Sequence, residues 1–215
     1  MTNTNDHVDN KHPMPLSGLK PALACFLGLT ILLAFAAGVI HYDIRIAVAG
    51  ASESGPIEYM QELFLFLIVL MFAFHAWHNP AQRGFAVLVG AFFLCLLIRE
   101  MNNLLHDISH GFWKYPTYLI AISAIAFSYI RRESTLTPLI AYSKHSSFGL
   151  MLAGMATLLV FSRLFGMSVL WQTALGDNYV RIAKNMAEEG TELLAYSLIF
   201  FSTFWFITVE NIKKR

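Results

Sequence analysis

Two histidines follow the third long apolar run of the chain, within residues 98–114 (IREMNNLLHDISHGFWK). His106 and His110 are four residues apart, a spacing that directs two imidazoles to the same side of a helix. If the helix continues this far, Arg99 lies on the same side and Glu100 lies beside it. Imidazole nitrogens and carboxylate oxygens are common ligands of zinc. The pattern therefore predicts a divalent metal site, with zinc as the first choice.

Further residues for such a site come from distant parts of the chain. We predict four metal ligands, two of which belong to a glutamate pair at i and i+4: His106, His110, Glu188 and Glu192. A bound metal would lower the pKa of a water molecule enough for hydrolysis near neutral pH. The predicted catalytic groups are a general base from among Glu62, Glu100 and Asp107, and an arginine, Arg99 or Arg163, that polarises a carbonyl or phosphoryl oxygen. The HDISH stretch lacks the glutamate of an HExxH motif, so a zincin mechanism is not indicated.

The same residues allow two other interpretations. Arginine and lysine side chains could neutralise the glutamates in a structural ion-pair network, for which the i and i+4 pair Lys184 and Glu188 is one candidate. Carboxylates and histidines could instead form part of a proton or cation path. Between Glu62 and His75, the second apolar run offers no polar residue for such a path. The last run offers several hydroxyl groups, on Tyr196, Ser197, Ser202, Thr203 and Thr208.

The elements that carry these residues are predicted to be transmembrane helices. Of the 215 residues, 56% are hydrophobic and only 13% are charged, with 18 phenylalanines, which is more apolar than a water-soluble core of this size requires. Six apolar runs are long enough, or nearly so, to cross a bilayer as helices. They cover residues 21–40, 59–77, 84–98, 115–130, 148–171 and 193–209. The predicted fold is an all-α, polytopic bundle of six spans.

The distribution of charge predicts the orientation of this bundle. With both termini inside, nine lysines and arginines fall in the inner segments and five in the outer ones. Basic residues near helix ends resist translocation, so this difference favours an N-in, C-in topology. Ten of the 14 acidic residues then fall on the outer side. The outer face is expected to be electronegative and to attract cations.

Three stretches complete the predicted organisation. Residues 1–20 form a disordered cytoplasmic tail, residues 21–212 a single six-helix membrane domain, and residues 213–215 a basic C-terminal tail. Residues 178–191 are amphipathic. They either begin the sixth helix early or form a lid over the polar site, with Gly190 as its hinge.

These observations predict a multi-pass protein of a bacterial inner membrane with a polar site that opens outward. Its predicted activity is metal-assisted hydrolysis or group transfer on a lipid-linked or periplasmic substrate. The alternatives are a proton- or cation-coupled transporter and a non-catalytic membrane subunit. Nucleic-acid, dinucleotide and P-loop patterns are absent from the sequence, so those classes are not predicted.

Overall fold

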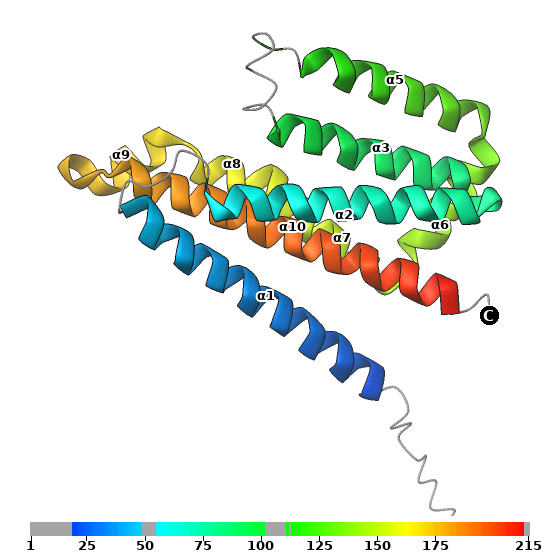
Figure 1. The fold of residues 1–215 in the computed structure, drawn as a ribbon, viewed down its shortest axis with the longest axis horizontal. Helices are drawn as coiled ribbons and strands as arrows, with labels where there is room; N and C mark the ends of the chain where they lie inside the picture. Colours follow the sequence, from blue (N-terminus) through cyan, green and yellow to red (C-terminus); the bar gives the residue numbers. More distant parts are fainter. Residues whose placement is uncertain (1–18, 49–54, 102–110, 112, 213–215) are drawn as a thin grey trace, which may run out of the picture.

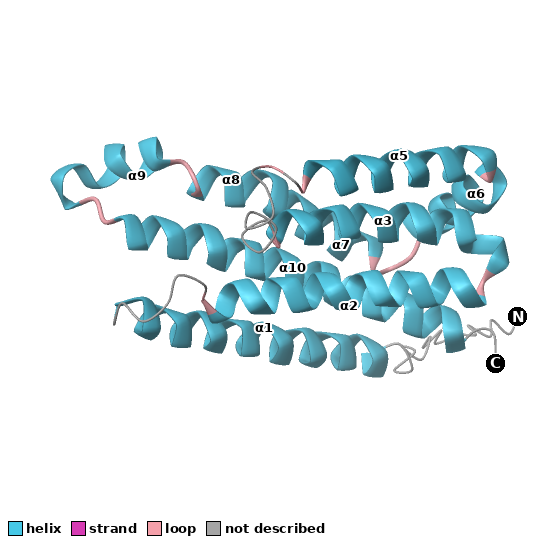
Figure 2. Cartoon of the chain, turned by 45° about the horizontal axis from the view of Figure 1, so that its top comes forward, coloured by secondary structure: helices cyan, strands magenta, loops and turns pink. Residues whose placement is uncertain are grey.

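The protein is described by a computed structural model that covers residues 19–48, 55–101, 111 and 113–212. Five long helices run roughly parallel or antiparallel to one another (Figures 1 and 2). They are α1 (Leu19–Val48), α2 (Pro56–His78), α3 (Arg83–Glu100), α5 (Lys114–Ile130) and α10 (Arg181–Ile212). All regular secondary structure in the described residues is helical, which confirms the predicted all-α bundle.

Shorter elements connect the long helices. Pro80–Gln82 (η2) is a 3-10 turn between α2 and α3, and Arg132–Ser143 (α6) follows α5. A broken helix then leads toward α10. Its parts are α7 (Phe148–Ala156), the π-helical segment η3 (Thr157–Phe161), α8 (Ser162–Phe165), α9 (Ser168–Leu175) and the 3-10 turn η4 (Gly176–Asn178).

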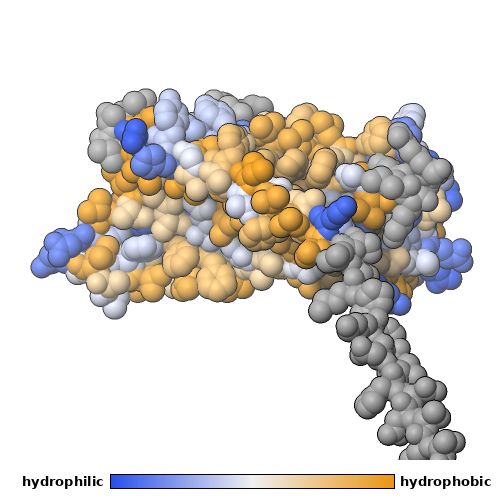
Figure 3. Space-filling model, turned by 90° about the horizontal axis from the view of Figure 1, so that it is seen from below, coloured by the Kyte–Doolittle hydropathy of each residue, from blue (hydrophilic) through white to orange (hydrophobic). Residues whose placement is uncertain are grey.

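Five helical stretches are long and apolar enough to cross a membrane. They are Leu19–Ile46, Pro56–His78, Pro80–Glu100, Phe148–Phe165 and Arg181–Val209. The predicted fourth span is α5, which at 17 residues is shorter than any of these five. Apolar residues cover the middle of the face in Figure 3, and hydrophilic residues gather mostly toward its two ends. The chain thus has several apolar helices suited to a multi-pass membrane protein.

The two ends of the bundle are named here after the predicted topology. The outer end holds the start of α2, the end of α3 and the start of α10, and the inner end holds the opposite termini of these helices. Helix α10 packs against α1, α2, α7 and α8. Its buried side chains Tyr196 and Ile199 belong to the same core as Phe72 and Phe93.

Helix α1 is bound to the bundle mainly near its outer end. Most of its side chains are exposed, but Ala36 and Asp43 are buried. The carboxylate of Asp43 accepts a hydrogen bond from the backbone N–H of Ile57, in the first turn of α2. An anionic oxygen is stabilised there because the first N–H groups of a helix lack intrahelical partners. This contact fixes α1 against the start of α2.

The structure differs from the prediction in two segments and decides between two alternatives in a third. Helix α1 begins at Leu19, so the last two residues of the predicted 20-residue tail are helical. Residues 131–147, predicted to be a connection, contain α6, whose Tyr142 ring packs against Phe85 and Phe206. Helix α10 is continuous from Arg181, so residues 181–191 begin the sixth helix early and do not form a separate lid. Residues 1–18 and 213–215 lie outside the described part of the chain.

Candidate functional site

A polar pocket of about 260 Å³ opens between α2, α3 and α10 at the outer end. Six of its lining residues are glutamates and one is an arginine. The full lining is Glu58, Gln61, Glu62, Arg99, Glu100, Glu188, Glu189 and Glu192. Glutamates that are far apart in the sequence therefore converge on one site, as expected from their common position at helix ends.

Helix α2 contributes its first two turns to the pocket. Glu58 and Glu62 are one helical turn apart, so they lie on the same side of the helix. Gln61 is buried and donates a hydrogen bond from Nε2 to the backbone carbonyl of Glu189, at 2.9 Å. This bond crosses from α2 to α10 and fixes the two walls of the pocket relative to each other.

Helix α3 contributes an ion pair from its last turn. Arg99 Nη2 lies 2.6 Å from Glu100 Oε1, and the same oxygen accepts a hydrogen bond of 2.7 Å from the Tyr196 hydroxyl. The Tyr196 side chain is fully buried below the pocket. Glu100 therefore joins α3 to α10 and has two donors for one of its oxygens. A basic residue in the last turn is also favoured by the helix dipole.

Helices α8 and α10 form a second polar contact beside the pocket. Glu192 Oε1 lies 3.3 Å from Arg163 Nη2 and 3.2 Å from Ser162 Oγ. Both partners directly follow the π-helical segment η3. A π turn contains more residues than an α turn and changes the direction in which the following side chains point, and such turns are common at functional sites. Here it precedes the two residues that contact a buried carboxylate.

The carboxylates of this region outnumber the basic groups. Arg99 lines the pocket, while Arg163 and Lys184 pair with pocket glutamates from outside the lining; Lys184 Nζ is 2.9 Å from Glu188 Oε2. Three basic groups thus face six glutamates. Within the described residues, neither Glu62 nor Glu189 pairs with a basic side chain. The pocket keeps an excess of negative charge.

The structure brings together most of the predicted site residues. Five of them line the pocket: Glu62, Arg99, Glu100, Glu188 and Glu192. Arg163 is adjacent through its ion pair with Glu192. The remaining three predicted residues, His106, Asp107 and His110, lie outside the described residues.

Four further residues belong to the site but are absent from the predicted set. They are Gln61, Glu58, Glu189 and Tyr196. Tyr196 follows Glu192 by four residues, a spacing that places both on one side of α10 and was a usable signal. Gln61 carried no such signal, because a single amide in a helix is compatible with any surface.

The predicted metal site stays a prediction. Among the described residues, no group of three or more histidine, cysteine, aspartate or glutamate side chains is arranged to hold a metal ion. Two of the four predicted ligands, His106 and His110, lie outside that part of the chain. The other two, Glu188 and Glu192, are both engaged in ion pairs. A metal bound here would have to compete with Lys184 and Arg163 for these oxygens.

Comparisons with protein families, curated proteins and solved structures found no match to this chain.

Proposed function

We propose that the protein binds a divalent cation in its outer pocket and uses it for hydrolysis or group transfer on a lipid-linked or periplasmic substrate, in a bacterial inner membrane. The observation that supports this proposal is the excess of carboxylates: six glutamates from three helices line one pocket with a single arginine. Carboxylate oxygens are preferred ligands of hard divalent cations, and with imidazoles they bind zinc.

The unpaired glutamates are the most available groups for this role. Glu62 and Glu189 face the pocket from opposite walls, on α2 and α10. Glu100 already accepts hydrogen bonds from two donors, so Glu62 is the better candidate for a general base. His106 and His110 follow Glu100 by six and ten residues and remain the proposed nitrogen ligands. Arg99 is the proposed electrophilic group, because it lines the pocket directly.

The test is elemental analysis of detergent-purified protein from metal-replete growth without chelator. Three variants accompany the wild type: H106A/H110A, E62Q/E189Q, and E133Q/D177N as a control with the same change in charge outside the pocket. We expect near-stoichiometric zinc, iron or manganese in the wild type and in the control. We expect at least tenfold weaker retention in H106A/H110A and in E62Q/E189Q, because losing a metal ligand weakens binding at least as much as losing a group that hydrogen-bonds to a ligand.

A wild-type protein without metal under these conditions would overturn the proposal, as would equal retention in all variants. Glutamine has the size of glutamate, so E62Q/E189Q tests the charge without opening a cavity. A metal-loaded protein would then be screened for hydrolysis of phosphate and acyl esters, with R99Q, which removes the proposed electrophilic group and no proposed ligand, as the variant expected to bind metal but lose activity.

A proton- or cation-coupled transporter is the second candidate, and one feature of α10 favours it. Below the pocket, Tyr196 is hydrogen-bonded to Glu100. Thr203, two turns closer to the inner end, has a buried hydroxyl without a hydrogen-bond partner among the described residues. Farther along, the buried ring of His75 lies 5.7 Å from Phe206 and its Nε2 is 2.7 Å from Gln82 Oε1. Polar groups thus occur at several depths between the two ends.

Flux measurements in proteoliposomes distinguish this candidate from the enzyme. A transporter predicts cation-dependent proton or metal flux that Thr203→Val reduces. An enzyme predicts no such flux and metal-dependent turnover. If the protein shows no flux and no turnover and binds no metal, the three ion pairs would be a structural network in a non-catalytic subunit.

A further inference from the structure

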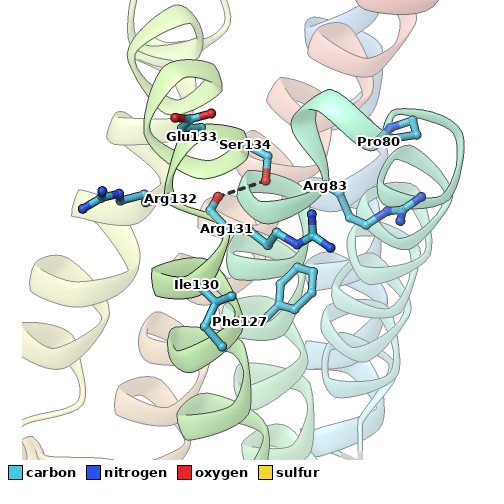
Figure 4. A pocket seen from close by; sticks show the side chains of 8 residues that line it. All are labelled: Pro80, Arg83, Phe127, Ile130, Arg131, Arg132, Glu133 and Ser134. Atoms are coloured by element: carbon cyan, nitrogen blue, oxygen red, sulfur yellow. Dashed lines mark hydrogen bonds between the residues drawn. The ribbon is translucent and has the colours of Figure 1, made fainter.

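A second polar pocket, of about 480 Å³, lies at the inner end between the start of α3 and the turn that joins α5 to α6 (Figure 4). Its charged lining has the opposite sign to that of the outer pocket. Arg83, Arg131 and Arg132 contribute three positive charges, and Glu133 contributes one negative charge. The excess of positive charge makes this a site for an anion.

Close backbone contacts fix the two sides of this pocket. The N–H of Gly84 donates to Ser134 Oγ at 3.2 Å, and Ser134 Oγ donates to the carbonyl of Arg131 at 3.0 Å. On the other side of Gly84, its carbonyl accepts a hydrogen bond of 3.4 Å from Ser128 Oγ. A Cβ atom at position 84 would overlap with Thr135 Oγ1. Only glycine allows this approach, and it holds Arg83 and Arg131 at a fixed separation.

The arginines are available for a ligand. Arg83 Nε donates to the carbonyl of Ala76 at 3.1 Å, which anchors the guanidinium and leaves its two Nη groups for another acceptor. In the described part of the chain, Arg131 and Arg132 form no ion pair. Figure 4 shows the side chains of Arg83 and Arg131 on the same side of the pocket, whereas Arg132 extends to the other side of the turn. Guanidinium groups of this kind bind phosphate through paired N–H donors.

The lower wall of the pocket is apolar and continues into an exposed apolar surface. Phe127 and Ile130 line the pocket beneath the arginines. Ile130 is 76% exposed and its neighbour Tyr129 is 80% exposed, so α5 presents apolar side chains next to the positive charges. A ligand with a phosphate group and acyl chains matches both surfaces. A soluble phosphate matches the arginines alone.

We propose that this inner pocket binds the phosphate of an anionic phospholipid headgroup, and that Arg83 and Arg131 make the main contacts with it. Basic pockets between helices on the cytoplasmic side are suited to such headgroups, because the inner leaflet is anionic. The apolar wall formed by Phe127 and Ile130 then contacts the start of the acyl chains. The site is separate from the outer pocket, so it does not depend on the metal proposal.

The experiment measures lipid binding to the full-length, detergent-purified protein by native mass spectrometry. Phosphatidylglycerol and the zwitterionic phosphatidylcholine are titrated separately. The test variant is R83Q/R131Q, and the matched control is R45Q/R181Q, which removes two exposed arginines from the outer end. We expect R83Q/R131Q to bind phosphatidylglycerol roughly thirtyfold more weakly, because each arginine near an anionic lipid contributes a factor of about five. The control should bind like the wild type, and phosphatidylcholine binding should not change.

Glycerol phosphate and inorganic phosphate, added as competitors, identify the source of the phosphate. Competition only at concentrations far above that of the lipid supports the lipid headgroup. Competition at equal concentration supports the arginine site but assigns it to a soluble phosphate. Equal affinity of R83Q/R131Q and the wild type would overturn the proposal, and so would an equal loss in both double variants. If R83Q/R131Q does not fold, R131Q alone, whose guanidinium forms no described ion pair, should still show a roughly fivefold loss.

Discussion

The outer and inner pockets of the bundle differ in charge and in how their charged groups are held. In the outer pocket, Glu100 and Glu192 are each bonded to a basic side chain and to a hydroxyl group from another helix. In the inner pocket, Arg83 has a backbone carbonyl as its partner, and backbone contacts of Gly84 set the geometry. The charged groups that these contacts hold are therefore fixed mainly by other side chains in the outer site and mainly through the main chain in the inner site. Substitutions should disrupt the two ends by different routes.

The largest effect is expected from Glu100→Ala at the outer end. This change leaves the buried Tyr196 hydroxyl and the Arg99 guanidinium without their shared acceptor. We expect a loss of about 3 kcal/mol in the free energy of unfolding, measured by SDS titration in mixed micelles. Glu133→Ala, which removes an exposed carboxylate at the inner end, should cost less than about 0.5 kcal/mol. Equal effects of the two variants would show that the Glu100 contacts contribute nothing.

Gly84→Ala should have the next largest effect and should act on the inner end. The added methyl group overlaps with the side chains of Ser134 and Thr135, so the turn between α5 and α6 must move. We expect a destabilisation of about 2 kcal/mol, together with weaker phosphatidylglycerol binding. Retention of metal at the outer end should not change. Gly149→Ala is the control, because nothing lies within 4 Å of a Cβ atom at that position.

The smallest effects on the free energy of unfolding are expected from substitutions that remove two hydroxyl groups on α10, those of Ser202 and Thr203. Ser202 Oγ donates to the carbonyl of Ser147 at 2.8 Å and lies 3.3 Å from the Tyr142 hydroxyl. Because Ser202 Oγ already donates its hydrogen to Ser147, it can accept a hydrogen bond from the Tyr142 hydroxyl. Ser202→Ala should therefore destabilise the protein by about 1 kcal/mol.

Thr203→Val, by contrast, should be neutral or stabilising by up to about 1 kcal/mol, because it removes a buried hydroxyl that has no hydrogen-bond partner in the described part of the chain. Thermal unfolding in detergent measures both changes. A clear destabilisation by Thr203→Val would show that this hydroxyl has a partner in the folded protein. The two variants thus test whether the polar groups between the pockets are structural.

Most of the helices could be predicted from the sequence, because continuous apolar runs are the strongest signal a membrane protein offers. The runs at 59–77 and 84–98 correspond to α2 and α3 within a few residues. The break of the fifth run into α7, η3, α8 and α9 was not predicted, because Arg163 interrupts the run but a single charged residue does not show where a helix breaks. Helix α6 was missed because RESTLTPLIAYS shows no apolar periodicity and contains Pro138. Tertiary contacts of Tyr142 stabilise it instead.

The sequence predicted the level of the bundle at which the candidate site lies, but not which of its side chains form pairs. Charged residues at the ends of apolar runs indicated that Glu62, Arg99, Glu100 and Glu192 share one level of the bundle. Their pairing depends on how each helix is rotated about its axis, and a helix that is apolar on all sides carries little information about its rotation. The bond between Glu100 and Tyr196 and the contact between Gln61 and Glu189 therefore had to come from the structure.

The length of α10 determines how a molecule in the membrane could approach the outer pocket. Its 32 residues extend about 48 Å, whereas the hydrocarbon layer of a bilayer is about 30 Å thick. With Ile212 at the inner boundary, about twenty residues cross this layer, so Glu188, Glu189 and Glu192 reach the level of the outer headgroups. A molecule anchored in the outer leaflet would then meet these glutamates sideways, through the layer its own headgroup occupies. If the substrate is lipid-linked, as proposed above, lateral entry of this kind would spare it the cost of leaving the membrane.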